Sequence, residues 1–472
     1  MTVQELLLMR HEWALIAGVL ILLVLELNFS EEQKSKSIIS AVILFSIITL
    51  LGFLPAESGS TFGGMYATDP VRILMKNILN LSVLIIFLQA GSWLQTKNNY
   101  NRVTEFYLLI LSSVIGASFM ISAGHFLMFY LGLELLTIPI TAAASYDQYK
   151  SKSAEAGIKL ILSSAFSSAI LLFGLSMLYG STGEMYFSEV RFSNDLIQVL
   201  GFVFFFSGLG FKISIVPFHL WTADVYEGSP TNVTSYLSVV SKGAAIFVLV
   251  LLLINLFEPL RLVWQQVIYG TAIFTMTIGN LFAIRQQNLK RFLAFSSIAQ
   301  AGFILLGVIG GSALGMATVI YFVLVYVFSN LAAFGVVIAI EQYAGKVNMA
   351  DYNGLYKTNP RLSLAMMLAL FSLAGIPPLA GFFGKFFLFT AVAASGFYIL
   401  LFIAVLNAVI SLYYYLLVVK AMFINKSESP VPYFQSDYPT RIALSACVIG
   451  IIVIGFYSPV FEYIKQLCLI SF

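Results

Sequence analysis

The feature that most constrains this chain is a series of apolar runs, each ended by charged residues, proline, glycine or asparagine. Most runs reach about 20 residues, the length at which a helix spans the roughly 30 Å hydrocarbon core of a bilayer. Of the 472 residues, 60% are hydrophobic and only 10% are charged. Soluble globular domains do not have this composition. The sequence therefore predicts an integral membrane protein.

Counting these runs predicts an all-α, polytopic membrane protein of about fourteen transmembrane helices. The first run is interpreted as a retained helix, because few positive charges precede it and no small-residue cleavage site follows it. No run alternates between apolar and polar residues as the strands of a membrane barrel do. The runs lie near 12–29, 38–54, 71–95, 104–122, 125–144, 154–180, 195–216, 229–256, 261–284, 289–309, 313–341, 361–394, 397–424 and 439–468.

Lysine and arginine are unevenly distributed over the predicted loops. Fifteen of the 25 fall on one side of the predicted membrane and five on the other. Because cytoplasmic loops are enriched in these residues, the bias predicts that both termini lie on the outer face. The five remaining basic residues lie inside predicted spans, and they are Lys76, Lys159, Lys212, Lys242 and Lys385.

A lysine inside a membrane span indicates an ion pathway. Insertion scales give a cost of roughly 2.5 to 3.5 kcal/mol for such a charge, so it usually lines a polar path or meets a partner. Lys76 follows Arg72 by about one helical turn, and we expect it to reach the membrane surface. Lys159 follows Glu155 at i,i+4 spacing, so a local ion pair is the first explanation and a transport role the second.

Two of the other lysines lie in helices that proline interrupts. Pro217 removes a backbone donor close to Lys212, and Pro377 and Pro378 break the helix that precedes Lys385. Broken helices in corresponding places of two halves indicate an ion or substrate site. An ordinary kink is the alternative for either break alone, but a buried lysine beside each one favours function.

Glu134 is the clearest carboxylate near the middle of a predicted span. We expect it to pair with Lys212, because each group keeps the other charged away from water. Lys242 lies roughly 15 Å from the edge of its span. The candidate proton carriers are therefore Glu134, Lys212, Lys242 and Lys385, with Lys159 as a less certain fifth. Polar residues that either hold water between them or join helices are Ser296, Ser297, Gln300, Tyr326, Ser329 and Asn330.

The sequence predicts no resident cofactor, metal or nucleic-acid partner. The three histidines are far apart in the chain and form no ligand pair. Cys447 and Cys468 have no neighbouring ligands and are interpreted as buried thiols. Because the chain has no nucleotide loop, flavin fingerprint or cluster ligands, any redox chemistry must belong to partner subunits.

Five segments resemble the antiporter-like membrane subunits of respiratory complex I, the NADH:quinone oxidoreductase. The similarity covers about residues 105–420. The segments are FYLGLELLTIP around Glu134, EAGIKLILSSAFSSAILLFGLSMLYGSTG from Glu155, VPFHLWTADVYEGSPTNVTSYLSVVSKGA from Val216, LKRFLAFSSIAQAGF from Leu289 and FSLAGIPPLAGFFGKFFLF from Phe371.

The resemblance implies three N-terminal helices over 1–103, inverted five-helix repeats over 104–256 and 257–425, and one C-terminal helix over 426–472. The first repeat is broken near Pro217 and the second near Pro377. Glu134 and Lys212 match the essential pair of the first repeat, Lys242 matches a central lysine and Lys385 an exit-side lysine.

The same resemblance implies a bacterial inner (plasma) membrane and a large complex. NADH, FMN, iron–sulfur clusters and quinone belong to the assembled complex and not to this chain. The implied partners are other antiporter-like subunits, small membrane subunits, a peripheral redox arm and membrane lipids.

Within this family, a lysine at position 385 and the lack of a long lateral helix favour the subunit N branch. The favoured function is proton translocation coupled to quinone reduction in partner subunits. The alternatives are a subunit of a cation/proton antiporter or membrane-bound hydrogenase complex, an autonomous transporter of sodium or a small solute, and a structural scaffold.

Overall fold

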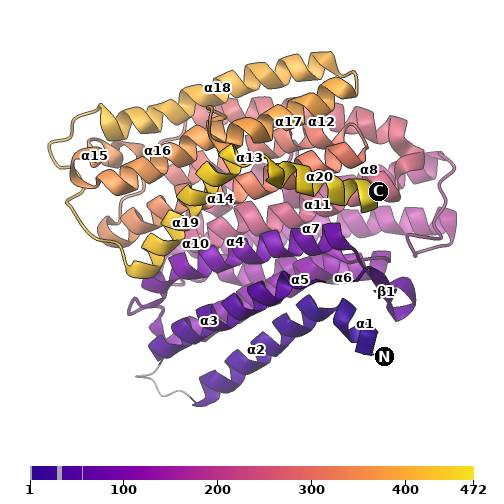
Figure 1. The fold of residues 1–472 in the computed structure, drawn as a ribbon, viewed down its shortest axis with the longest axis horizontal. Helices are drawn as coiled ribbons and strands as arrows, with labels where there is room; N and C mark the ends of the chain where they lie inside the picture. The colour runs from indigo at the N-terminus through magenta and orange to yellow at the C-terminus, as the bar shows by residue number, and fades with distance from the viewer. Residues whose placement is uncertain (1–2, 29–33, 56, 472) are drawn as a thin grey trace.

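The protein is a bundle of long helices packed side by side (Figure 1). A computed structural model describes residues 3–28, 34–55 and 57–471. After α1 (Val3–Leu8), its helices are α2 (Arg10–Asn28), α3 (Lys34–Gly52), α4 (Pro70–Leu94), α5 (Val103–Ile121), α6 (Phe126–Ala144), α7 (Ser151–Thr182), α8 (Leu196–Ile213), α9 (Leu220–Gly228), α10 (Thr231–Tyr236), α11 (Lys242–Asn255), α12 (Arg261–Ile284), α13 (Leu289–Val308), α14 (Ala313–Ala344), α15 (Leu355–Thr358), α16 (Pro360–Ala374), α17 (Ala380–Ala394), α18 (Tyr398–Phe423), α19 (Tyr438–Phe456) and α20 (Pro459–Ser471).

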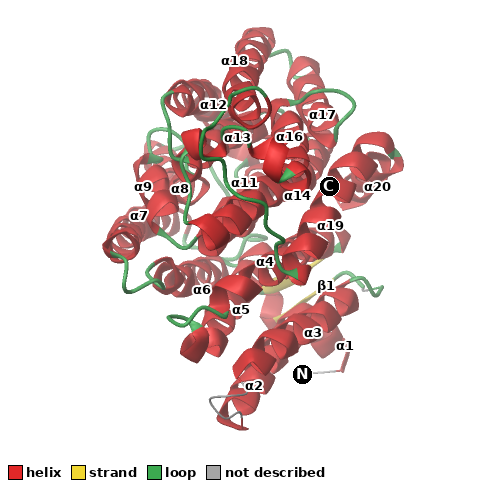
Figure 2. Ribbon diagram, turned by 90° about the vertical axis from the view of Figure 1, so that its left-hand side faces the viewer, coloured by secondary structure: helices red, strands yellow, loops and turns green. Residues whose placement is uncertain are grey.

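The observed helices confirm the predicted polytopic, helical fold. Within the described ranges, 13 helical segments are long and apolar enough to cross a membrane. The shorter apolar helices α16 and α17 together occupy the remaining predicted span, near 361–394. Figure 2 shows α2 and α3 at one edge of the bundle and α18 at the opposite edge. Of the helices between them, α11, α13 and α14 are almost completely buried.

Two local features differ from the predicted spans. A short antiparallel hairpin, β1 (Gly59–Thr61) and β2 (Tyr66–Thr68), connects α3 to α4. The last predicted span, 439–468, is two helices, because α19 ends at Phe456 and Pro459 begins α20. A proline fits the first turn of a new helix but interrupts the interior of an existing one.

Both predicted helix breaks are present. At the first break, α8 ends at Ile213, Ser214 is left-handed at φ 65°, and the chain becomes helical again as α9. At the second break, α16 ends at Ala374, Gly375 has φ 90°, and the chain becomes helical again as α17. Each break therefore leaves helix-terminal carbonyl groups inside the bundle without intrahelical partners.

The ends of the chain lie at the same end of the bundle. Figure 1 shows both termini at the right-hand end, near β1, whereas α15 lies at the left-hand end. This arrangement agrees with an even number of membrane crossings.

Gly381 is required where α17 begins beside α16. An added Cβ would lie 1.7 Å from the backbone oxygen of Ser372. Gly381→Ala is therefore expected to destabilise the protein by about 1–3 kcal/mol through overpacking. Thermal denaturation in detergent measures the change, with Gly180→Ala as control because a Cβ there meets nothing within 4 Å. Equal melting temperatures of the two variants would contradict this expectation.

Candidate functional site

Lys212 lies in the last turn of α8, immediately before the first break. Its side chain is 6% exposed. Its Nζ donates to Thr137 Oγ1 on α6 (2.9 Å) and to Ser164 Oγ on α7 (2.5 Å). Two neutral hydroxyl groups therefore hold this ammonium in place, and one of its three donors is left for another acceptor.

Glu134 lies one helical turn before Thr137 on α6 but does not form the predicted ion pair. Its Oε1 accepts a hydrogen bond from Ser168 Oγ (2.5 Å), and none of the described salt bridges joins it to Lys212. Ser164 and Ser168 are one turn apart on α7, so one helix separates the two charges by binding each through a hydroxyl. The carboxylate is near enough to act electrostatically on Lys212 without direct contact.

Lys242 lies in the centre of the bundle and is 2% exposed. It follows a π-helical stretch, η4 (Leu237–Ser241), and begins α11. Its Nζ donates to Ser297 Oγ (2.5 Å) and Ser297 O (3.2 Å) on α13. A cavity of about 10 Å³ lies beside it, and its polar lining residues are Ser238, Lys242, Ser297, Gln300 and Tyr326.

Lys385 is held by the second break. Its side chain is 4% exposed, and its Nζ donates to Ala374 O (2.9 Å), the last carbonyl of α16. Ser411 Oγ on α18 accepts a longer hydrogen bond (3.4 Å), and the Phe303 ring lies 4.6 Å from the ammonium. A helix C-terminus carries partial negative charge, so the interrupted helix itself supplies the partner for this cation.

Polar side chains join the first site to the helix that carries Lys242. Ser113 on α5 donates to Leu136 O (2.6 Å), within the turn of α6 that holds Glu134. Tyr236 on α10 donates to Ser113 Oγ (2.7 Å). This buried link runs from the α6 turn to the residues directly before η4.

A second polar link runs from Lys242 to the second break. Gln300 lies one turn after Ser297 and donates to Leu373 O (3.0 Å), next to the carbonyl that accepts from Lys385. All six polar residues predicted between the lysines are buried. Besides Ser297 and Gln300, three more of them bond to side chains outside their own helix: Ser296 to Tyr415 (2.5 Å), Ser329 to Ser372 (2.7 Å) and Asn330 to Ser238 (2.7 Å).

Lys159 lies outside this buried line. Its side chain is 41% exposed and pairs with both Glu155 (2.7 Å) and Asp224 (2.7 Å). Asp224 and Glu227 lie on α9 and pair with Arg291 of α13 at 2.7 and 2.9 Å. These residues form a charged network that fastens α9 to α7 and α13.

A further buried ion pair was not predicted. Lys76 was expected to reach the membrane surface, but it is 1% exposed and pairs with Glu12 (2.6 Å), which is fully buried. Tyr66 completes the group by donating to Glu12 Oε2 (2.9 Å) and accepting from Lys76 (3.1 Å). The prediction was wrong because it considered Lys76 without the carboxylate at the edge of the first span.

The comparisons with known proteins agree with this geometry. Residues 123–411 match the family described as NADH:quinone oxidoreductase/Mrp antiporter, TM. The chain belongs to this family. It is 50% identical over 469 residues to NADH-quinone oxidoreductase subunit N of Phocaeicola vulgatus, an alignment that covers 99% of both chains.

Solved structures extend the comparison. The chain is 28% identical, with a TM-score of 0.79, to a chain in respiratory complex I from Thermus thermophilus with bound aureothin; the match covers 96% of this chain and 98% of that one. A chain of the Mrp complex from Dietzia sp. DQ12-45-1b shares the fold, with a TM-score of 0.83, 20% identity and coverage of 99% and 97%.

The two cysteines and the carboxylates do not assemble into a metal site in the described part of this family member. No group of three or more His, Cys, Asp or Glu side chains there is placed to hold a metal ion. Cys447 and Cys468 are both buried free thiols.

Proposed function

We propose that this chain translocates protons as a membrane subunit of an NADH:quinone oxidoreductase. NADH oxidation and quinone reduction take place in partner subunits, which carry NADH, FMN, iron–sulfur clusters and quinone. The observation that carries the proposal is a line of three buried lysines, each held by hydroxyl or carbonyl groups, with polar side chains between them. Among the ion pairs of the described residues, none joins a carboxylate to Lys212, Lys242 or Lys385.

Glu134 and Lys212 form the switch of the first half. Burial disfavours the charge of an amine, whereas an approaching carboxylate favours it. The Ser164 and Ser168 hydroxyls hold these two groups near each other but apart. A small shift of α7 or of either side chain therefore changes their attraction, and with it the proton affinity of Lys212.

Lys242 passes the proton between the halves, and Lys385 delivers it through the second break. Gln300 Oε1 and Tyr326 OH are buried, have no protein partner and line the cavity beside Lys242. A polar cavity of about 10 Å³ has room for roughly one water molecule, which such atoms ordinarily bind. This supports transfer through a bound water rather than through direct contact between lysines.

Lys159 and its carboxylate partners form the cytoplasmic mouth of the pathway. The proposed orientation follows the basic loops, which places both termini on the outer face of a bacterial inner membrane. We assign residues 104–256 and 257–425 to two inverted repeats, and the presence of one helix break in each range supports this assignment. The partners are other membrane subunits of the complex and its peripheral arm, and lipids cover the remaining apolar surface.

The α7 serines provide a direct test of the proposed switch. Ser164→Ala removes a hydrogen bond to a charged group, and an interaction worth about 1.5–3 kcal/mol predicts pumping slower by roughly 10- to 150-fold. The measurement is NADH-driven proton uptake by membrane vesicles, divided by NADH oxidation. Ser176→Ala is the control, because this exposed hydroxyl on α7 bonds only within its own helix. Equal ratios for both variants would contradict the proposed switch.

The same assay decides between proton pumping and sodium antiport, which the related Mrp fold favours as the second candidate. Vesicles that contain the assembled complex are supplied with NADH in sodium-free and sodium-containing media. We expect proton uptake at the same rate in both media. A requirement for sodium, or sodium movement driven by a proton gradient, would overturn the proposal.

A further inference from the structure

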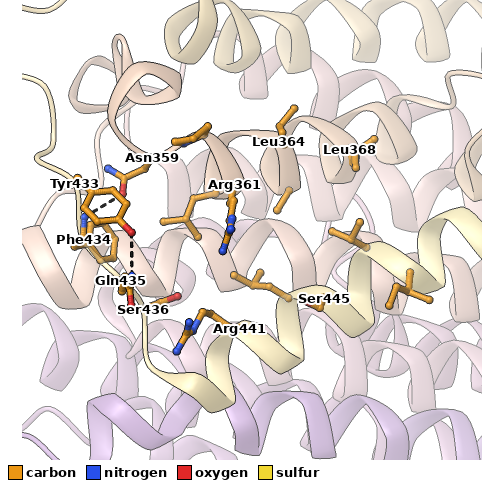
Figure 3. Close-up of a pocket in the computed structure, with 16 residues that line it drawn as sticks. Asn359, Arg361, Leu364, Leu368, Tyr433, Phe434, Gln435, Ser436, Arg441 and Ser445 are labelled. Atoms are coloured by element: carbon orange, nitrogen blue, oxygen red, sulfur yellow. Dashed lines mark hydrogen bonds between the residues drawn. The ribbon is translucent and has the colours of Figure 1, made fainter.

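A groove of about 690 Å³ lies between α16 and α19, outside the buried lysine line. Figure 3 shows Arg361 extending from α16 toward α19, and Arg441 beside the first turn of α19. The connection before α19 closes the end of the groove with Tyr433, Phe434, Gln435 and Ser436. The groove therefore has walls on two helices and a polar rim at one end.

The rim is positively charged. Arg361 is the second residue of α16 and Arg441 the fourth of α19, so both helices begin beside the groove. The first turn of α16 has no side-chain cap and adds N–H donors and partial positive charge, whereas the N-terminus of α19 is capped by Asp437, whose carboxylate accepts from Thr440 N (3.1 Å). Neither arginine forms an ion pair with a described residue, and the groove lining contains no Asp or Glu. A phosphate group matches this charge and the planar donors of two guanidinium groups.

The walls below the rim are apolar. Leu364 and Leu368 follow Arg361 along one face of α16, and Val448 and Ile449 follow Arg441 along α19. Residues at these spacings project from the same side of a helix. A second groove of about 380 Å³ shares Arg441, Ser445 and Ile449 with the first. Each wall thus begins with an arginine at the membrane edge and continues as apolar surface toward the membrane interior.

Contacts within the chain hold the rim of the groove. Asn359 Nδ2 donates to Pro432 O (3.0 Å), and Phe434 N donates to Asn359 Oδ1 (3.3 Å). The Phe434 ring stacks on Tyr343 with 4.1 Å between centroids, and Gln435 donates to Tyr433 OH (3.1 Å). A ligand therefore meets a rim whose conformation is fixed by contacts within the chain.

We propose that this groove binds an anionic phospholipid. The phosphate lies against Arg361 and Arg441, and the acyl chains follow the apolar faces of α16 and α19. Basic pockets between transmembrane helices are a recognised setting for anionic lipid headgroups. The inference rests on the groove and its charges alone and is independent of the proton pathway.

The test measures lipid retained by the purified, detergent-solubilised complex. The complex is delipidated, mixed with phosphatidylglycerol or with phosphatidylcholine of the same chain length, and examined by native mass spectrometry. We expect selective retention of phosphatidylglycerol, reduced about 10- to 30-fold in an Arg361→Gln, Arg441→Gln double variant. An Arg285→Gln, Lys97→Gln double variant removes the same charge elsewhere and should retain the lipid.

Three results would overturn the proposal: equal retention of both lipids, unchanged retention in the groove variant, or displacement of the lipid by inorganic phosphate alone. A second measurement needs no variant and covers the case in which the double variant fails to assemble. Phosphatidylglycerol with a diazirine in its acyl chain is photolysed on the native complex. Crosslinks to peptides of α16 or α19 are expected, and labelling that avoids both helices would also overturn the assignment.

Discussion

Replacement of Lys242 by methionine is expected to slow NADH-driven proton uptake about a hundredfold or more while the complex still assembles. Methionine has a similar length and remains compatible with the apolar surroundings, so the change removes the ammonium and little packing. The variant has no ammonium to donate hydrogen bonds to the hydroxyl and carbonyl of Ser297. The polar link through Gln300 therefore loses the group that carries the proton. Proton uptake and NADH oxidation are measured in the same vesicles.

The matched control is Lys346→Met, which removes a lysine from the loop between α14 and α15. We expect this variant to pump normally, because its charge is outside the buried line. Assembly is followed by native gel electrophoresis of solubilised membranes. If Lys242→Met assembles and pumps at the control rate, this lysine carries no protons and the chain acts as a scaffold.

The second large effect concerns stability. Replacement of Glu12 by leucine is expected to destabilise the protein by about 3–5 kcal/mol, because it leaves the Lys76 ammonium buried without its carboxylate. The double variant Glu12→Leu, Lys76→Met removes both charges and is expected to recover most of that loss. Tyr66 keeps its place in the hairpin and retains a second acceptor at Leu8 O (3.2 Å).

Denaturation in detergent, followed for the two single variants and the double variant, gives the coupling free energy of the pair. Glu258→Gln is the control, because its ion pair with Arg261 (3.1 Å) is solvent-exposed. An exposed pair of this kind contributes about 0–1 kcal/mol. Additive losses in the Glu12, Lys76 double variant would show that the two groups do not depend on each other.

Much of the fold follows from the sequence because the bilayer imposes one length on every span. Helix α12 matches its predicted range in full, and most of the others agree within a few residues. Interruptions were predictable only where proline lies inside a span, as at Pro217 and Pro377. The division of the last span required knowing that Pro459 begins a helix instead of kinking one.

The site was predicted less completely, because a sequence shows which groups are buried but not which of them meet. Lys212, Lys242 and Lys385 are buried, as their positions inside apolar runs predicted. The prediction that Glu134 contacts Lys212 directly was wrong. Ser164 and Ser168 separate the two groups, and serine is too common in apolar helices for the sequence to indicate this role. The Glu12–Lys76 pair was missed for a similar reason, because its members are on different helices and far apart in the chain.

The π-helical stretch η4 determines which neighbouring helix the side chains before and after it face. Tyr236, just before it, bonds to α5, whereas Lys242, just after it, bonds to α13. A π-type turn holds one residue more than an α-turn and rotates everything that follows about the helix axis. Deleting a single residue here would leave the composition almost unchanged yet turn the ammonium away from Ser297. The position of the central proton carrier is thus encoded in the number of residues as well as in their identity.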